Sequence, residues 1–129
     1  MTPRQFALFA AGLVLPTLYQ RLKFALNRRS FYRTELRRKS GLNIHHGHWG
    51  LVLAAVSTWM LVFGLRDYIS IGLAGLGWGL MLDEIIPMLR MPSKDRDLEL
   101  KVYGDSGRAT AILIITTVLA SSVLFLLLG

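Results

Sequence analysis

Hydrophobic residues in this chain gather in long runs with very few charged residues, and short charged blocks separate them. The runs cover residues 5–20, 46–65, 68–86 and 109–128. A soluble helical protein would instead place charged residues on one side of every helix, with a period of 3.6 residues. Roughly 20 apolar residues in an α-helix cross the ~30 Å hydrocarbon core of a bilayer. The pattern therefore predicts an all-α membrane protein with about four transmembrane helices.

The runs differ in how clearly they indicate a membrane helix. Residues 109–128 contain no charged side chain and are rich in Ile, Leu and Val, so this run is the clearest. Residues 5–20 form a short run between Arg4 and Arg21, and Pro16 inside it predicts a kink. A re-entrant or interfacial helix is the alternative for this first run. The 129 residues are expected to form a single membrane domain.

The second and third runs predict a helical hairpin. The link between them, around Arg66 and Asp67, is so short that the two helices must be antiparallel neighbours. Each helix carries a stripe of small or polar residues at helical spacing. The stripes are His46, Gly50, Ala54 and Thr58 on one helix, and Gly72, Gly75, Gly79 and Asp83 on the other. We expect these two faces to touch. The small-xxx-small pair Gly75 and Gly79 also offers a surface for self-association.

Basic residues are concentrated after the first run. The net charge is +7, and eight of the fifteen basic residues lie between Arg21 and Lys39, with Glu35 as the only acid. Apolar residues recur within this block at roughly helical spacing, which predicts a basic interfacial helix over residues 21–39. Because the block adjoins a membrane segment, anionic lipid headgroups are favoured over nucleic acid as its partner. The chain has no cysteine, which excludes disulfides and thiolate metal sites.

Charge also predicts the orientation of the helices. Basic loops remain in the cytoplasm, so the block Arg21–Lys39 is expected on the cytoplasmic side. The loop 87–108 carries five basic residues and falls on the same side if all four runs cross the bilayer. Both termini and the Arg66-Asp67 turn then lie outside. The sequence thus predicts a multi-pass protein of the cell membrane.

The most distinctive polar residues lie at the two ends of the hairpin that face the cytoplasm. His45, His46 and His48 are the only histidines and open the second run, while Asp83 and Glu84 close the third. At 1.5 Å per residue, counted from the hairpin turn, the two groups differ in depth by roughly 3–9 Å. Imidazole and carboxylate groups suit zinc, iron or manganese. These five residues are therefore a candidate metal site at the cytoplasmic membrane boundary.

Several roles for this site remain open. Three histidines and one carboxylate would complete a tetrahedral zinc shell, whereas fewer ligands would leave a position for water, with Glu84 as a general base. A proton or salt-bridge network would satisfy the same carboxylates, which are costly beside lipid. A further interpretation is that these histidines and carboxylates are ordinary residues of the membrane interface with no special role. His46 is the histidine best directed at the glycine face, and His45 and His48 must bend inward to join it.

Residues 44–50, Ile-His-His-Gly-His-Trp-Gly, and residues 75–84, Gly-Leu-Gly-Trp-Gly-Leu-Met-Leu-Asp-Glu, carry one resemblance. The pair is similar to a pattern in uncharacterised small prokaryotic integral membrane proteins. There, a His-His-x-His-aromatic-Gly segment opens one transmembrane helix and a Gly-x-Gly-x-Gly segment ending in Asp-Glu closes the next. The resemblance covers roughly residues 44–86. It implies a shared hairpin and polar site, and no particular activity.

Three classes of function follow from these expectations. The first is a binding or structural subunit of the membrane with a metal or proton site. The second is a metal-dependent enzyme acting on lipid headgroups or another substrate at the interface. The third is an oligomeric cation carrier or channel, which is disfavoured because the first and last runs offer little beyond threonine and serine to continue a polar path.

Overall fold

A computed structural model of the chain describes residues 1–26, 46–90 and 96–128, and in this part of the chain all regular structure is α-helical. The helices are α1 (Pro3–Leu26), α3 (His46–Val62), α4 (Tyr68–Arg90), α5 (Arg96–Asp105) and α6 (Gly107–Leu128). The prediction of an all-α fold is confirmed. His45 and residues 27–39 of the predicted basic helix lie outside the described residues.

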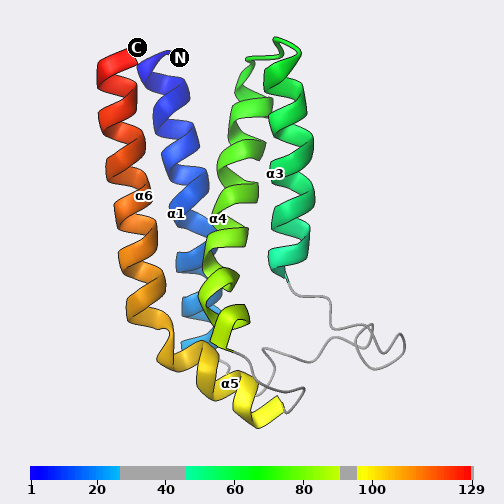
Figure 1. The fold of residues 1–129 in the computed structure, drawn as a ribbon, viewed down its shortest axis with the longest axis vertical. Coiled ribbons are helices and arrows are strands. Elements are labelled where there is room, and N and C mark those ends of the chain that lie inside the picture. The colour runs from blue at the N-terminus through cyan, green and yellow to red at the C-terminus, as the bar shows by residue number, and fades with distance from the viewer. Residues whose placement is uncertain (27–45, 91–95, 129) are drawn as a thin grey trace.

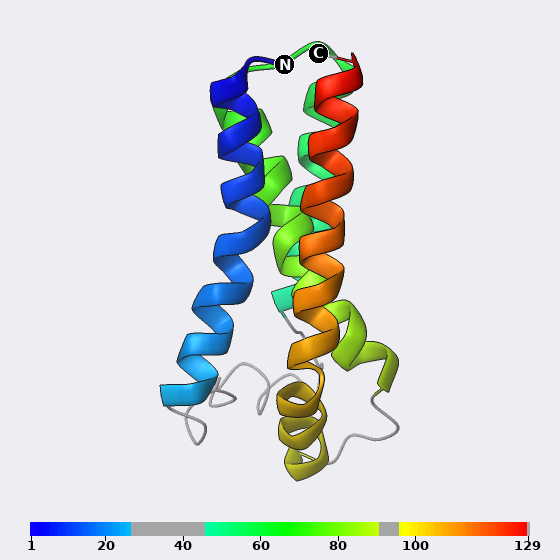
Figure 2. The same ribbon diagram turned by 90° about the vertical axis from the view of Figure 1, so that its left-hand side faces the viewer.

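Four long helices stand side by side, and the short α5 crosses one end of them (Figure 1). Helix α4 is central and packs closely against both α1 and α3, while α6 contacts α1 and α4 (Figure 2). Both termini lie at the end of the bundle that also holds the turn between α3 and α4 (Figure 1). The opposite end holds α5, the first residue of α3 and the last residues of α1 and α4.

The predicted hairpin of α3 and α4 is present, and local sequence explains its turn. Gly64 has a positive φ of 84°, which glycine adopts without strain. The amides of Gly64 and Leu65 donate to the carbonyls of Leu61 and Met60, which is the usual way an α-helix ends at a glycine. Asp67 then caps α4, because its Oδ1 accepts a hydrogen bond of 2.7 Å from the amide of Ser70.

Glycines let α4 approach both neighbours, but the stripe with Gly75 and Gly79 meets a different helix from the one predicted. A Cβ on Gly79 would lie 2.6 Å from the carbonyl oxygen of Leu13, and one on Gly75 would collide with Phe9, so both glycines face α1. Helix α3 instead packs its Gly50 face on the other side of α4. The spacing identified a shared face correctly, but a central helix has two packed sides and the spacing does not say which neighbour each side meets.

This packing uses Gly75 and Gly79 within one copy of the chain, since both are buried against α1. The surface that these glycines were expected to offer to a second copy is therefore covered. On the α3 side, a Cβ on Gly50 would lie 2.7 Å from the amide nitrogen of Met81, and one on Gly77 would collide with Ala54. The expected contact of the α3 stripe with α4 is thus made through Gly77.

Two helices extend beyond their predicted boundaries, and each contains a proline. Helix α1 continues through Pro16 to Leu26, so the first six residues of the predicted interfacial helix 21–39 belong to α1. Helix α4 was expected to end at residue 86 but continues through Pro87 to Arg90. A proline removes one N–H bond and its φ is still helical, so it interrupts one hydrogen bond without always ending the helix. Since Pro87 has no N–H, it leaves the backbone carbonyl of Asp83 without its usual helical donor.

The segment expected as a solvated loop, residues 87–108, is also more structured than predicted. It contains the end of α4, the ten residues of α5 and the start of α6, which begins at Gly107 rather than Ala109. Helix α5 carries Tyr103, which is fully buried, so the segment contributes to the interior of the molecule.

Among the described helices, two are long and apolar enough to cross a membrane: α4 and α6. Half of the most apolar stretch of α4 is buried, as expected for the central helix. In α6, only 6% of the corresponding stretch is buried. Apolar side chains are exposed along α1 and α3 too. They include Leu15, Leu18 and Leu22 on α1, and Val52, Val56 and Trp59 on α3.

Candidate metal centre

A cluster of polar side chains is buried at the end of the bundle near α5. Its members come from all five helices and the junction of α5 with α6. They are Arg21, His46, Asp83, Glu84, Tyr103, Ser106 and Thr110. Both carboxylates and the tyrosine are almost inaccessible, with exposures of 0% or 1%. Burying two carboxylates is costly unless cations or hydrogen-bond donors surround them.

Asp83 is the centre of the cluster because both of its oxygens have partners. Oδ1 accepts a hydrogen bond from Nε of Arg21 at 3.2 Å. Oδ2 accepts one from the hydroxyl of Tyr103 at 2.8 Å and lies 3.1 Å from Nε2 of His46. Helices α1, α3 and α5 thus each send one side chain to a single carboxylate of α4.

His46 connects the two carboxylates. Its Nε2 lies 2.9 Å from Oε1 of Glu84 as well as 3.1 Å from Asp83. The close approach of α3 to α4 makes this possible, because a Cβ on Gly47 would lie 2.7 Å from Cβ of Glu84. A glycine directly after the histidine therefore lets the start of α3 come down onto the carboxylates.

The structure brings together one histidine and both carboxylates of the predicted site. One ligand atom from each of His46, Asp83 and Glu84 can be chosen so that all lie within 4.8 Å of one another. The prediction that a histidine of the second run meets Asp83 and Glu84 is confirmed. The choice of His46 as the best-directed histidine also agrees with the structure.

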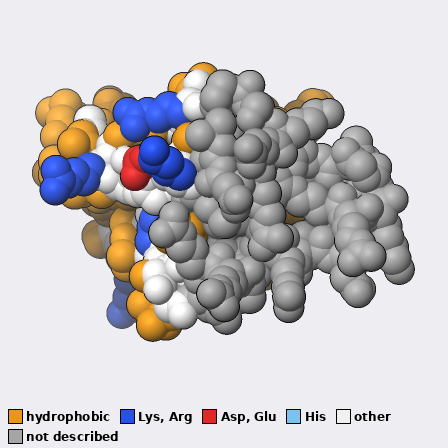
Figure 3. Space-filling model, turned by 90° about the horizontal axis from the view of Figure 1, so that it is seen from below, with side chains coloured by type: hydrophobic (Ala, Val, Ile, Leu, Met, Phe, Trp, Pro, Cys, Tyr) orange, Lys and Arg blue, Asp and Glu red, His pale blue; other side chains and the backbone are white. Residues whose placement is uncertain are grey.

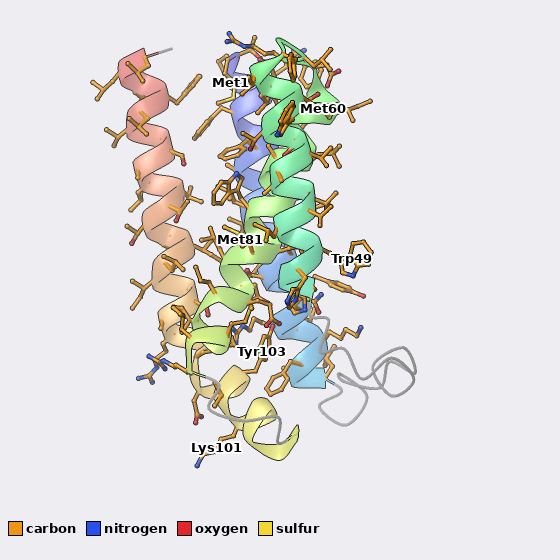
Figure 4. All side chains as sticks on the ribbon, turned by 45° about the vertical axis from the view of Figure 1, so that its right-hand side comes forward. Met1, Trp49, Met60, Met81, Lys101 and Tyr103 are labelled. Carbon is orange, nitrogen blue, oxygen red and sulfur yellow. The ribbon has the colours of Figure 1, made fainter. Side chains whose placement is uncertain are left out.

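His48 does not join this group. His48 follows His46 by two positions, so its side chain is rotated by about 200° around the helix axis. The His48 side chain is exposed. The neighbouring Trp49 is 62% exposed and points away from the bundle (Figure 4). The expectation that His48 bends inward is therefore not met, and His45 lies outside the described residues.

Arg21 is one of the members of the cluster that the sequence did not predict. Besides Asp83, its guanidinium donates to the backbone carbonyl of Tyr103, to Oγ of Ser106 at 3.3 Å and to Oγ1 of Thr110 at 3.1 Å. Its Cζ also lies 3.9 Å from the centre of the Tyr103 ring. Guanidinium has five donors in a planar fork, which lets one side chain connect α1 to α4, α5 and α6.

Tyr103 was missed as well, since the segment that contains it was expected to be a connector without site residues. It lies at the α5 end of the bundle (Figure 4). Burial raises the pKa of its phenol, and the nearby Asp83 carboxylate raises it further. The phenol therefore stays protonated and serves as a hydrogen-bond donor to Asp83 at all ordinary pH values. An aromatic residue inside a charged segment was the only available signal.

The charges of the cluster indicate what it can bind. Asp83 and Glu84 contribute two negative charges and Arg21 one positive charge, so one negative charge remains while His46 is neutral. A cation held between His46 and the carboxylates, or a proton on His46, would compensate it.

Comparisons of the chain with protein families, with curated proteins and with solved structures found no match. Function is therefore inferred from the site itself.

Proposed function

We propose that this chain is a multi-pass membrane protein that binds a divalent metal ion at His46, Asp83 and Glu84. Membrane embedding is supported by α6, a 22-residue helix that is long and apolar enough to cross a membrane and of whose most apolar stretch only 6% is buried. At 1.5 Å per residue, helices of 17 to 24 residues measure roughly 26–36 Å, close to the thickness of the hydrocarbon core. The outward apolar faces of α1 and α3 extend the same surface around the bundle.

Metal binding is supported by one observation above all. Three ligand atoms from two helices converge in a buried place, with Nε2 of His46 2.9 and 3.1 Å from an oxygen of each carboxylate. One imidazole and two carboxylates match the ligands of zinc, iron or manganese. Three protein ligands leave at least one coordination position for water or a substrate. We propose that the chain is a metal-binding subunit of the membrane. Because a coordination position stays open, a metal-dependent enzyme is the alternative role.

The site end of the bundle is proposed to be cytoplasmic. This end carries Lys23, Arg90, Lys101 and Arg108, and basic side chains lie around the end of the molecule where α5 is found (Figure 3). Loops rich in lysine and arginine remain in the cytoplasm of most membrane proteins. Membrane-impermeant labelling of a cysteine introduced at Lys101, in intact cells, tests this orientation. Labelling from outside would contradict it.

Elemental analysis of the detergent-purified protein tests metal binding. We expect close to one zinc, iron or manganese per chain, and loss of most of it in His46→Gln and Glu84→Gln. His48→Gln is the matched control, because it removes a histidine two residues away whose side chain is exposed. Equal metal content in all four proteins, or none in the wild type after loading and washing, would contradict the proposal.

A proton site is the second candidate, and the charge balance favours it. If His46 is protonated, its charge and that of Arg21 cancel those of Asp83 and Glu84. His46 also lies within hydrogen-bonding distance of both carboxylates. Nuclear magnetic resonance of ¹⁵N-labelled histidine distinguishes the two candidates. A His46 ring that stays protonated on both nitrogens when zinc is added supports the proton site, whereas loss of the Nε2 proton supports metal binding.

A further inference from the structure

Helices α1 and α6 are joined at both ends and separated in between. At the end with the termini, the rings of Phe6 and Phe125 stack with their centres 4.7 Å apart. At the other end, Arg21 holds Ser106 and Thr110. Between these contacts the helices form the two sides of an open groove of about 300 Å³, with the buried Ile114 at its floor.

The groove wall is apolar. Helix α1 contributes Val14 and Leu18, and α6 contributes Ala111, Ile115 and Leu119. Thr17 also lines the groove, but its hydroxyl oxygen is buried and the wall presents only carbon atoms. A ligand in this groove therefore gains only from apolar contact, which disfavours polar metabolites and extended peptides, whose polar groups would stay unpaired there.

The length of the groove matches one leaflet of a bilayer. From Ala111 to Leu119 a helix rises about 12 Å, whereas half of a ~30 Å hydrocarbon core is about 15 Å. A volume of about 300 Å³ is that of a small-ligand pocket, whereas a packed helix needs a face for a cylinder about 10 Å wide. The dimensions thus favour a single extended hydrocarbon chain over a helix from a partner.

A positive charge lies at the mouth of the groove. Arg108 is three residues before Ala111 and so lies on the same side of α6, one turn closer to the polar end. Its side chain is exposed, and the structure gives it no carboxylate partner within the described residues. More basic side chains lie around this end of the molecule (Figure 3). An anionic headgroup positioned above the groove would therefore meet the exposed guanidinium of Arg108.

We infer that the groove between α1 and α6 binds one acyl chain of an anionic phospholipid, whose phosphate contacts Arg108. The lipid belongs to the leaflet on the same side as the polar cluster. This inference rests on the proposed membrane embedding of the chain but not on the proposed metal. It also places a lipid ester near the level of Arg21 and Thr110, at the edge of that cluster.

Native mass spectrometry of the detergent-purified protein tests the inference. The protein is titrated with phosphatidylglycerol and with phosphatidylcholine of equal chain length. We expect one phosphatidylglycerol to be retained in preference to phosphatidylcholine. Arg108→Gln should lower that preference about fivefold, the effect of one basic residue at an anionic membrane surface. Arg4→Gln, which removes a charge at the opposite end of α1, is the matched control and should change nothing.

A second variant tests the groove apart from the charge. Ala111→Phe fills the groove and should reduce retention of both lipids, whereas Ile112→Phe, on a residue that does not line the groove, should not.

Equal retention of the two lipids by the wild type, or no effect of Arg108→Gln, would overturn the inference. So would disulfide cross-linking of Ala111→Cys between two copies in membranes, because a second copy would then cover the groove. Metal content is measured on the same Arg108→Gln sample, so failure of the lipid site is distinguished from failure of the metal site.

Discussion

Replacement of Arg21 by glutamine is expected to destabilise the fold more than any other single removal of a basic side chain in the described residues. The variant loses the Nε bond to Asp83 and the bonds that hold Tyr103, Ser106 and Thr110. It leaves the Asp83 carboxylate, which is 0% exposed, without its cationic partner. His46 and Tyr103 remain as its only described neighbours with donors.

The magnitude follows from the burial of this ion pair. Removal of one partner of a buried pair typically costs about 3–5 kcal/mol, because the other charge stays buried without compensation. The Arg21 side chain is 20% exposed, so water partly screens the ion pair and the lower end of that range applies. A loss of about 3 kcal/mol in the free energy of unfolding corresponds to about 150-fold in the ratio of folded to unfolded protein.

Reversible unfolding in mixed detergent micelles, followed by helical circular dichroism, measures this loss in metal-free protein. Lys23→Gln is the matched control: it removes an exposed basic residue of the same helix and should change stability by less than about 0.5 kcal/mol. Combining Arg21→Gln with Asp83→Asn removes both charges, so the double variant should be more stable than the sum of the single effects predicts. A cost of less than about 1 kcal/mol for Arg21→Gln, or strict additivity with Asp83→Asn, would refute the reasoning.

Three further predictions concern single contacts. Tyr103→Phe removes the donor to Asp83 and should lower the free energy of unfolding by about 1.5–3 kcal/mol, as for other hydrogen bonds to charged groups. Gly79→Ala should cost about 1–3 kcal/mol through overpacking against α1, whereas Gly72→Ala, whose Cβ would make an ordinary contact of 3.4 Å with Leu8, should cost less; both are measured by the same unfolding assay. The backbone amide of Ser70 lowers the pKa of Asp67, so its contribution to stability is present above the unfolded pKa near 4 and is lost as pH falls through the lower folded value. Thermal unfolding between pH 3 and 7 should show this loss in the wild type and not in Asp67→Asn.

Much of the hairpin could be predicted from the sequence because it depends on local features. The short link around Asp67 requires antiparallel neighbours, and the i+4 steps from His46 to Gly50 and Ala54 identify one helix face. Counting residues from the turn then places His46 near the depth of Asp83 and Glu84. The structure agrees with each of these steps.

The rest depends on contacts between helices that no spacing rule specifies. Arg21 was interpreted as a topology signal, although a single base at the end of an apolar run is also a candidate partner for buried carboxylates. Tyr103 and Ser106 lie in a charged segment without periodicity. Likewise, whether Gly75 and Gly79 face α1 or α3 depends on the order of the helices across the bundle.

Zinc K-edge X-ray absorption spectroscopy of the zinc-loaded protein tests the metal site most directly. A zinc site formed by His46, Asp83 and Glu84, as proposed above, would show one imidazole nitrogen and carboxylate oxygens at about 2.0–2.2 Å, with water completing the coordination. In His46→Gln the imidazole signal should disappear, and in His48→Gln it should remain. A spectrum with no imidazole in the wild type, or one that His46→Gln leaves unchanged, would contradict a metal centre built from His46, Asp83 and Glu84.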